Sequence, residues 1–254
     1  MGYILELKDI GMNYHDTTSE TIAIKDVSLD VSEGEFVSIV GPSGCGKSTL
    51  LSIISGLLPP SRGECLIGGT PTSENSGRAV GYMLQSDHLF EWRTILGNAL
   101  LGLEVRGELN TANRAACESL LARYGLAEFS SHRPSQLSGG MRQRAALIRT
   151  LAINPSILLL DEPFSALDFQ TRLRVTDDIA TIIRKEGKTA VLVTHDISEA
   201  VSVSDRVIVL SKRPSQIINI HSVGLSNIET PPIAAREHPD FRKHFNLIWK
   251  ELEC

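Results

Sequence analysis

Hydrophobic and polar positions alternate along the first third of the chain, which predicts β-strands. Residues 4–7 and 27–31 follow this pattern, which is typical of strands with one buried face. Residues 36–40 form a nearly continuous apolar run, as expected of a buried strand. Residues 65–67 and 79–83 are further short strand candidates. The first third is therefore expected to be mainly β-structure.

The middle of the chain shows helical periodicity instead. The pattern extends over residues 95–151, with segments at 112–124 and 141–153. Apolar runs then return at residues 157–160 and 190–194, as expected of parallel strands covered on both faces. A helix over residues 177–186 is predicted between them. The order of elements predicts an α/β fold interrupted by a helical insert.

The C-terminal tail carries its own pattern. Two prolines at 231–232 break the chain, and Pro239 and Asp240 can open a last helix. One face of that helix would carry its apolar residues, Phe241, Phe245, Ile248, Trp249 and Leu252. Packing on its own domain is the simpler interpretation. A helix that faces a partner or a second copy is the alternative.

Composition narrows the class of protein. The chain has 254 residues, of which 42% are hydrophobic and 22% charged, an ordinary globular balance. The formal net charge of −5 and the lack of a basic face give no support to a nucleic-acid partner. Apolar runs are too short to span a bilayer. The cysteines show no metal-ligand spacing, which favours reduced thiols in a cytosolic protein: Cys45, Cys65, Cys117 and Cys254.

A glycine-rich phosphate loop follows the apolar run 36–40. Its residues are Gly41, Pro42, Ser43, Gly44, Cys45, Gly46, Lys47, Ser48 and Thr49. Backbone N–H groups can cradle phosphates only where no side chain intervenes, which explains the glycines. Lys47 can reach the β- and γ-phosphates, and Ser48 can ligate Mg²⁺. A helix predicted over residues 49–54 adds an N-terminus that favours an anion. The loop therefore predicts a nucleotide site.

Two carboxylates supply the second half of this site. Asp161 ends the apolar run 157–160, at the carboxyl edge of the sheet where ligands bind in such folds. Glu162 follows directly and points another way. Asp161 can therefore serve a metal ion while Glu162 orients or deprotonates an attacking water. A solvated acidic turn is the alternative.

A second anion site is predicted at residues 137–144. Ser138 is a good N-cap, and Gly139 and Gly140 expose the backbone at a helix start. The γ-phosphate of one nucleotide would occupy only one of the two anion sites in a monomer. Two chains arranged head to tail, with each nucleotide between them, resolve this. An ordinary capped helix is the alternative.

These segments together resemble the nucleotide-binding subunit of an ATP-binding cassette (ABC) transporter over nearly the whole chain. The resemblance implies that residues 41–49 are the Walker A loop and 157–161 the Walker B strand. It implies that Glu162 is the catalytic glutamate. Residues 137–141 match the family signature, with Met141 where glutamine is more frequent.

Other matches to the family are weaker on their own. Gln85 matches the glutamine that senses the γ-phosphate and the metal ion, and residues 165–168 match the D-loop at the dimer interface. His195 matches the switch histidine, although in isolation a satisfied histidine at a strand end would be the better interpretation. Tyr14 stands where the family places an aromatic ring against adenine, but it could also simply cover the sheet.

The resemblance also implies an architecture: an α/β P-loop NTPase core of mainly parallel sheet, with an N-terminal antiparallel β subdomain and an inserted α-helical subdomain. Residues 1–254 would form a single ABC ATPase domain. Residues 1–85 and 152–222 would be its catalytic core. Residues 86–151 would be the helical subdomain with the signature, and residues 223–254 the tail helix.

ATP and Mg²⁺ are the implied cofactors, with ATP held between two copies of the chain. The residues expected at the γ-phosphate are Lys47, Ser138, Gly140 and His195. Gln85 and Asp161 would join Ser48 at Mg²⁺, and Glu162 would position water for in-line attack. Catalysis would consist mostly of positioning and electrostatics.

Finer features are similar to the nitrate/sulfonate/taurine importer group, whose relatives also serve thiamine precursors or riboflavin. They are Cys45, residues 91–93, residues 141–144, residues 211–214 and the terminal helix. Cys45 lies near a helix N-terminus, which favours the thiolate, and is expected to be alkylated readily.

The resemblance implies partners as well. Integral membrane permease subunits would contact the chain between Gln85 and Arg93, at the cytoplasmic face of the cell membrane. A periplasmic or lipoprotein solute-binding protein would act indirectly. An exposed tryptophan beside an arginine, here Trp92 and Arg93, is a typical interface anchor, with core packing as the alternative. The competing function is a cassette ATPase that regulates a non-transport partner.

Overall fold

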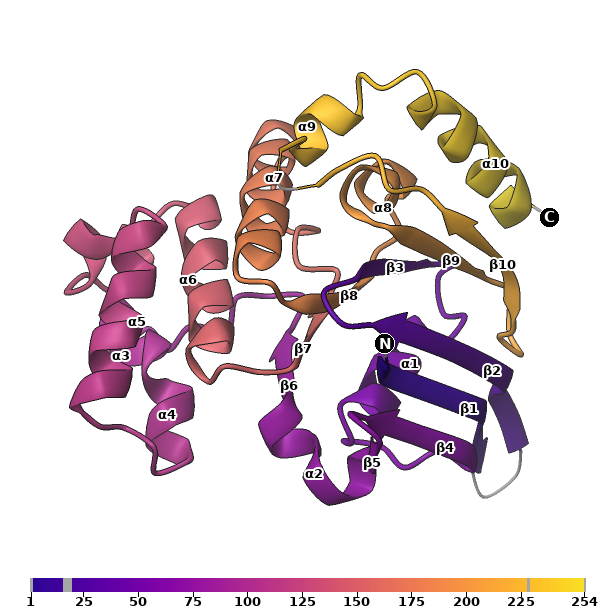
Figure 1. Cartoon of the computed structure of the whole chain (residues 1–254), viewed down its shortest axis with the longest axis horizontal. Helices are drawn as coiled ribbons and strands as arrows, with labels where there is room; N and C mark the ends of the chain where they lie inside the picture. The colour runs from indigo at the N-terminus through magenta and orange to yellow at the C-terminus, as the bar shows by residue number, and fades with distance from the viewer. Residues whose placement is uncertain (1, 16–19, 228, 254) are drawn as a thin grey trace.

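A mostly parallel sheet forms the centre of the molecule (Figure 1). The computed structural model describes residues 2–15, 20–227 and 229–253. The six-stranded sheet has the order β10-β9-β3-β8-β7-β6. Its strands are β3 (Phe36–Val40), β6 (Val80–Met83), β7 (Ile157–Asp161), β8 (Thr189–Val193), β9 (Arg206–Leu210) and β10 (Ile217–Ser222). Neighbouring strands pair in parallel, except that β10 runs antiparallel to β9.

A second, antiparallel sheet packs beside the first, at the lower right of Figure 1. Its order is β2-β1-β4-β5. Its strands are β1 (Tyr3–His15), β2 (Glu20–Ser32), β4 (Arg62–Ile67) and β5 (Thr70–Pro71). The first two are longer than the alternating stretches at residues 4–7 and 27–31 predicted. Their pairing contains several register shifts, which interrupt the alternation that the sequence shows.

Helices cover both faces of the central sheet, and a separate lobe of helices extends to the left in Figure 1. The lobe contains α3 (Ile95–Ala99), α4 (Leu101–Val105), α5 (Thr111–Arg123) and α6 (Gly139–Ala152). The remaining helices are α1 (Lys47–Ile54), α2 (Thr72–Ala79), α7 (Phe169–Lys185), α8 (Ile197–Val203), α9 (Pro232–Ala235) and α10 (Phe241–Glu253). The helical insert predicted between the strands is therefore present as this lobe.

Strand β7 shows why its sequence is apolar at consecutive positions. Leu158 and Leu160 belong to the hydrophobic cluster that includes the helical lobe and α7. Ile157 and Leu159 belong to the cluster that includes α1 and the antiparallel sheet. Each strand of a parallel sheet covered on both faces needs apolar side chains in both directions. The two clusters fix β7, and therefore its last residue, between two layers.

The predicted start of one helix is wrong. The helix expected over residues 177–186 starts instead at Phe169. Asp168 is its N-cap and accepts a hydrogen bond from the backbone N–H of Thr171 at 3.1 Å, which is the capping geometry that favours a helix start. Elements α2, α8, β9 and β10 were not among those predicted.

The C-terminal helix α10 packs on its own domain. Its Ile248 is buried in a cluster with apolar residues of α8 and β9. Glu251 accepts a hydrogen bond from Asn219 and lies 2.8 Å from Nε2 of His221, both on β10. Trp249, predicted on the apolar face, remains 48% exposed and stacks on Phe245. Packing against α8 and β9 is therefore the main role of this helix in the single chain.

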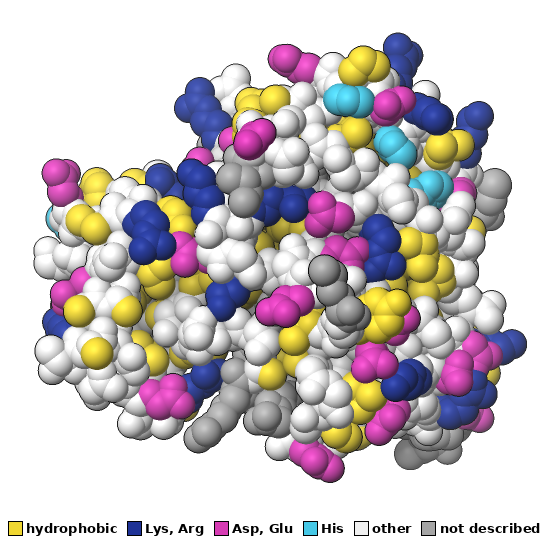
Figure 2. All heavy atoms as spheres, in the orientation of Figure 1, with side chains coloured by type: hydrophobic (Ala, Val, Ile, Leu, Met, Phe, Trp, Pro, Cys, Tyr) yellow, Lys and Arg dark blue, Asp and Glu magenta, His cyan; other side chains and the backbone are white. Residues whose placement is uncertain are grey.

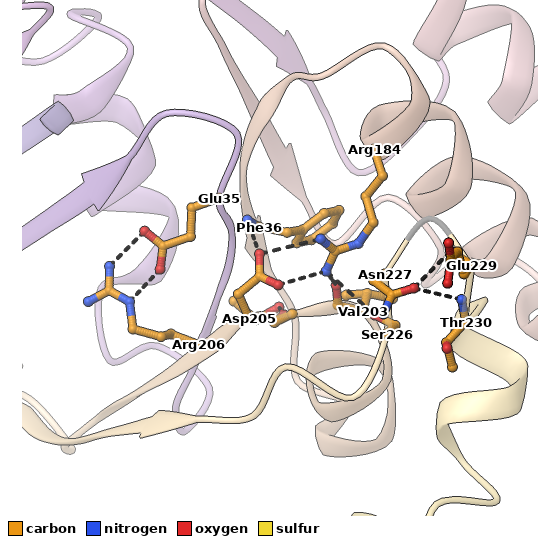
Figure 3. Close-up of polar contacts among 12 residues, drawn as sticks. Glu35, Phe36, Arg184, Val203, Asp205, Arg206, Ser226, Asn227, Glu229 and Thr230 are labelled. Carbon is orange, nitrogen blue, oxygen red and sulfur yellow. Dashed lines mark hydrogen bonds and ion pairs between the residues drawn. The ribbon is translucent and has the colours of Figure 1, made fainter. Parts of the chain in front are cut away.

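Ion pairs hold the amino ends of the central strands together (Figure 3). Asp205, just before β9, accepts hydrogen bonds from the Phe36 backbone N–H at 2.8 Å and from Arg184 at 3.1 Å. Arg184 also donates to the carbonyl of Val203. Arg206 and Glu35 form an adjacent pair. These contacts fasten α7, β3 and β9 at one edge of the sheet.

Acidic and basic side chains are interspersed over the face seen in Figure 2, without a large area of one sign. This matches the formal net charge of −5 and the lack of a basic stretch in the sequence. Within the described part of the chain, every helix is too short or too polar to cross a membrane.

Candidate functional site

The phosphate loop connects β3 to α1, at the carboxyl end of β3. Gly44 and Gly46 adopt positive φ angles of 72° and 120°, which glycine reaches without the strain that a side chain imposes. Gly46 is the residue before α1. The sequence therefore makes a loop whose backbone N–H groups are exposed at a helix start, as expected of an anion site.

Lys47 is buried at the first turn of α1. Its Nζ donates hydrogen bonds to the carbonyl oxygens of Gly41 at 2.8 Å and Pro42 at 3.0 Å. The ammonium is thus held within the loop by neutral acceptors. A phosphate oxygen would give it a charged partner, and hydrogen bonds between charged groups are stronger than those to neutral ones.

Asp161 lies at the end of β7 beside the phosphate loop. Its carboxylate accepts hydrogen bonds from the hydroxyls of Ser48 and Tyr82, both at 3.3 Å. Burial raises the pKa of Asp161 above its ordinary value, and the Ser48 hydrogen bond opposes part of this shift. A hydroxyl and a carboxylate at this separation are the hard oxygen donors that fit Mg²⁺, with phosphate oxygens completing the shell. Burial and the charge of Asp161 also raise the pKa of Tyr82.

Glu162 and His195 meet at the ends of two neighbouring strands. Asp161 is paired with Val193 in the parallel register of β7 and β8, so the residues that follow lie side by side. The backbone N–H of Glu162 donates to the Val193 carbonyl at 2.9 Å. Glu162 has a positive φ of 44°, uncommon for a residue with a side chain. Its Oε2 lies 3.0 Å from Nδ1 of His195, whose side chain is 58% exposed.

A cavity of about 580 Å³ brings these groups together. Its lining residues are Ser43, Gly44, Gly46, Lys47, Ser48, Thr49, Glu162, His195 and Arg213. The sequence analysis predicted all of them as site residues except Arg213, which it treated as a subgroup feature. Arg213 lies far along the sequence from the phosphate loop, and no local pattern indicates its position.

Gln85 and Tyr14 lie at the margin of the site and do not line the cavity. Nε2 of Gln85 donates to the hydroxyl of Ser165 at 3.1 Å, and Ser165 donates to the Glu162 carbonyl at 3.0 Å. Gln85 is therefore linked to the turn that holds Glu162. The hydroxyl of Tyr14 lies 3.3 Å from that of Thr49. Tyr14 is 44% exposed.

Residues 138–140 lie outside the cavity. The Ser138 hydroxyl accepts a hydrogen bond from the Met141 N–H at 3.4 Å as the N-cap of α6. A Cβ at Gly140 would approach the Val175 side chain to 2.8 Å. Gly140 therefore allows α6 to pack closely on α7. The described chain does not bring this predicted anion site to the phosphate loop.

Two further expectations concern exposure. Trp92 is 71% exposed, so core packing is not its role, and it stacks on Phe90 with ring centroids 4.7 Å apart. Arg93 pairs with Glu104 at 2.6 Å.

Cys45 is only 1% exposed. This burial contradicts the expected ready alkylation of Cys45, because a thiol must be accessible to react.

Comparison with known proteins now decides the family. Residues 24–165, which include the phosphate loop, Asp161 and Glu162, match the family described as ABC transporter. The chain belongs to the ABC transporter family.

Relatives of this ABC family chain match nearly its whole length. The uncharacterized ABC transporter ATP-binding protein YtlC of Bacillus subtilis (strain 168) is 46% identical over 248 residues, covering 98% of this chain and 95% of YtlC. The taurine import ATP-binding protein TauB of Yersinia pestis bv. Antiqua (strain Antiqua) is 41% identical over 222 residues, covering 86% of this chain and 87% of TauB.

Solved structures of ABC proteins share the fold. The dimeric ATP-binding cassette MJ0796, in a post-hydrolysis state bound to ADP and Pi, is 35% identical, with a TM-score of 0.72 over 86% of this chain and 98% of that chain. CbiO1 from Clostridium perfringens has a TM-score of 0.78 at 24% identity, covering 99% of this chain and 97% of that chain. The predicted fold class is confirmed.

Proposed function

We propose that this chain is the subunit of a membrane importer that binds and hydrolyses ATP with Mg²⁺. One observation carries the proposal. One cavity of about 580 Å³ is lined by the phosphate loop, by the buried Lys47 and by the Glu162–His195 pair. The carboxylate of Asp161, at the end of β7, borders this cavity through Ser48. The family membership and the similarity to YtlC, an ATP-binding protein by name, support it.

Each residue has a proposed role. The backbone of residues 41–49 and Lys47 bind the phosphate chain, and Tyr14 contacts the adenine. Ser48, Asp161 and Gln85 hold Mg²⁺, which neutralises phosphate charge when it is bound. Glu162 orients the attacking water. His195 holds the Glu162 carboxylate at 3.0 Å and faces the same cavity. These groups act by position and electrostatics.

A second copy of the chain completes the site in this proposal. Ser138, Gly139 and Gly140 present backbone N–H groups at the start of α6, yet they do not line the cavity of their own chain. A head-to-tail dimer would place them against the phosphate of the partner's nucleotide. The dimeric structure of MJ0796 bound to ADP and Pi supports such an arrangement.

The proposed domain is single and spans residues 1–254, with residues 1–85 and 152–222 as catalytic core, 86–151 as helical subdomain and 223–254 as tail. Permease subunits would contact the surface near Trp92, at the cytoplasmic face of the membrane. The exposure of Trp92 and its stack on Phe90 support this.

The transported solute would be nitrate-, sulfonate- or taurine-like, or a vitamin precursor. It would be delivered by a separate solute-binding protein. The similarity to TauB, described as a taurine import protein, supports an importer. Purification of the tagged chain with its membrane partners tests this assignment. Trp92→Ala should recover less permease than the wild type, whereas recovery of a non-membrane complex in place of a permease would contradict transport.

A mixing experiment tests the shared site. Lys47→Ala and Ser138→Arg are each prepared in a Glu162→Gln background, so that ATP hydrolysis does not dissociate the dimer. In a mixed dimer, the intact loop of the Ser138→Arg chain faces the intact signature of the Lys47→Ala chain. Sedimentation velocity with Mg-ATP should therefore detect dimers in the mixture but not with either variant alone.

Melting temperatures provide the control, because both variants must be folded. Two folded variants that do not associate when mixed would contradict the head-to-tail site. A wild-type chain that binds no ATP would contradict the proposed function as a whole.

A further inference from the structure

Arg213 stands at the tip of the hairpin that joins β9 to β10. Its Nη2 donates a hydrogen bond to the carbonyl oxygen of Gly44 at 2.8 Å. The side chain lines the same cavity as Lys47, Ser48 and Thr49. Residues 169 positions apart in the sequence are thus in contact at the phosphate loop. None of the roles assigned above uses this arginine.

The hairpin is fixed in place by its own hydrogen bonds. The Ser211 hydroxyl donates to the carbonyl of Lys212 and accepts from the backbone N–H of Gln216, both at 2.9 Å. Ser215 is buried and exchanges backbone hydrogen bonds with β2, donating to the Ala23 carbonyl and accepting from the Lys25 N–H. The backbone that carries Arg213 is therefore held to both β9 and β2.

Arg213 approaches the phosphate loop from the side that Glu162 and His195 do not occupy. In the sheet order, β9 lies on one side of β3, and β8 and β7 lie on the other. Glu162 follows β7 and His195 follows β8, whereas Arg213 follows β9. The two sides of the loop thus carry different chemistry: a carboxylate and an imidazole on one side, a guanidinium on the other.

The charge of Arg213 is uncompensated within the described part of the chain. Its hydrogen bond is to a neutral carbonyl, and within the described residues no carboxylate forms an ion pair with it. A guanidinium has several N–H donors in a planar fork that matches phosphate oxygens. With one donor anchored on Gly44, the remaining donors are free for an anion in the cavity.

We propose that Arg213 is a further phosphate-binding residue of the nucleotide site, and this rests on the proposed function. It binds the part of the phosphate chain that ATP and ADP share, because it lies across β3 from the hydrolytic pair. Arg213 therefore retains nucleotide in the site and takes no part in water attack. The expected signature is a higher KM with a nearly unchanged kcat.

Calorimetric titration of the full chain with Mg-ADP and with pyrophosphate tests this role. Arg213→Gln removes the charge, and its shorter side chain also loses the hydrogen bond to the Gly44 carbonyl. It should weaken binding of both probes about 10-fold, the size expected for one charge-assisted hydrogen bond. Arg213→Lys should recover part of the loss. Lys212→Ala is the matched control, because Lys212 lies in the same hairpin but lines a different cavity.

Salt dependence separates a charge contact from mere support of the loop. Wild-type affinity for pyrophosphate should fall with ionic strength more steeply than that of Arg213→Gln. Equal affinities and equal salt dependence in wild type and Arg213→Gln would overturn the proposal, as would a change in kcat alone. If the wild type binds ADP but Arg213→Gln binds it equally well, this inference fails while the proposed function stands. Unchanged melting temperatures without nucleotide verify folding.

Discussion

Charged side chains have different partners at the two ends of the central strands, here called the amino edge and the carboxyl edge of the sheet. At the amino ends of the strands, charged groups satisfy one another: Asp205 pairs with Arg184, and Glu35 with Arg206 (Figure 3). At the carboxyl ends, Lys47 is bonded to carbonyls and Asp161 to hydroxyls, so neither has an opposite charge as its hydrogen-bond partner.

This difference separates stability from binding. Ligands in open α/β sheets bind at the carboxyl ends of the strands. The loops after β3, β7, β8 and β9 all bring polar groups to one cavity at that edge. Substitutions at the amino edge should therefore change the free energy of unfolding, and substitutions at the carboxyl edge should change nucleotide binding or turnover.

The largest expected effect lies at the carboxyl edge. Glu162→Gln removes the carboxylate proposed to orient water, and the steady-state ATPase rate should fall by about 10² to 10⁴-fold. Affinity for Mg-ATP should stay within a few-fold, and an ATP-stabilised dimer should accumulate. A variant that hydrolyses ATP at the wild-type rate would show that Glu162 does not orient the water.

A substitution at the amino edge should give the next largest effect, a loss of free energy of unfolding. Asp205→Ala leaves Arg184 and the Phe36 N–H without their carboxylate, and should lower the free energy of unfolding by about 2 kcal/mol. The KM for ATP should not change. Urea denaturation measures the first and steady-state kinetics the second. Glu128→Ala, an exposed acidic residue of the helical lobe, is the control and should change neither.

A smaller effect tests the adenine contact. Tyr14→Ala should weaken ATP binding about 10-fold, in the range expected for loss of stacking between a base and an aromatic ring. Tyr14→Phe keeps the ring and loses only the contact with Thr49, so its affinity should remain near that of the wild type. If both variants lose affinity equally, the hydroxyl and not the ring is the important group.

The smallest effect concerns the stability of the nucleotide-free protein. Burial raises the pKa of Asp161 above 3.8, so the folded state holds this proton to higher pH than the unfolded state. Stability is therefore lost as pH rises from 3.8 through the folded-state pKa, and the cost persists at neutral pH. Asp161→Asn should raise the melting temperature at neutral pH by about 1–3 °C. It should also abolish Mg-dependent turnover.

The pH series is the control for that last variant. The difference in melting temperature between wild type and Asp161→Asn should narrow as the pH is lowered toward 3.8. A difference that is constant with pH would assign the gain to packing instead of the charge.

Sequence reasoning predicted the candidate site where its elements are local. The phosphate loop and Asp161 follow apolar runs directly, so the carboxyl edge could be predicted from the pattern alone. Helix α7 was predicted too short because its first turns lack a continuous apolar stripe, although Asp168 provides an N-cap. Arg213 was not predicted to line the cavity, because its position depends on the hairpin that Ser215 binds to β2.

Strand β7 has a mechanical consequence. Its alternate leucines are packed into two separate clusters, one shared with the helical lobe and one shared with α1. Densely packed interiors transmit displacement and do not absorb it. A displacement of the helical lobe would therefore be transmitted to β7, and with it to Asp161, which accepts a hydrogen bond from Ser48. Strand β7 thus connects the packing of the helical lobe directly to the candidate site.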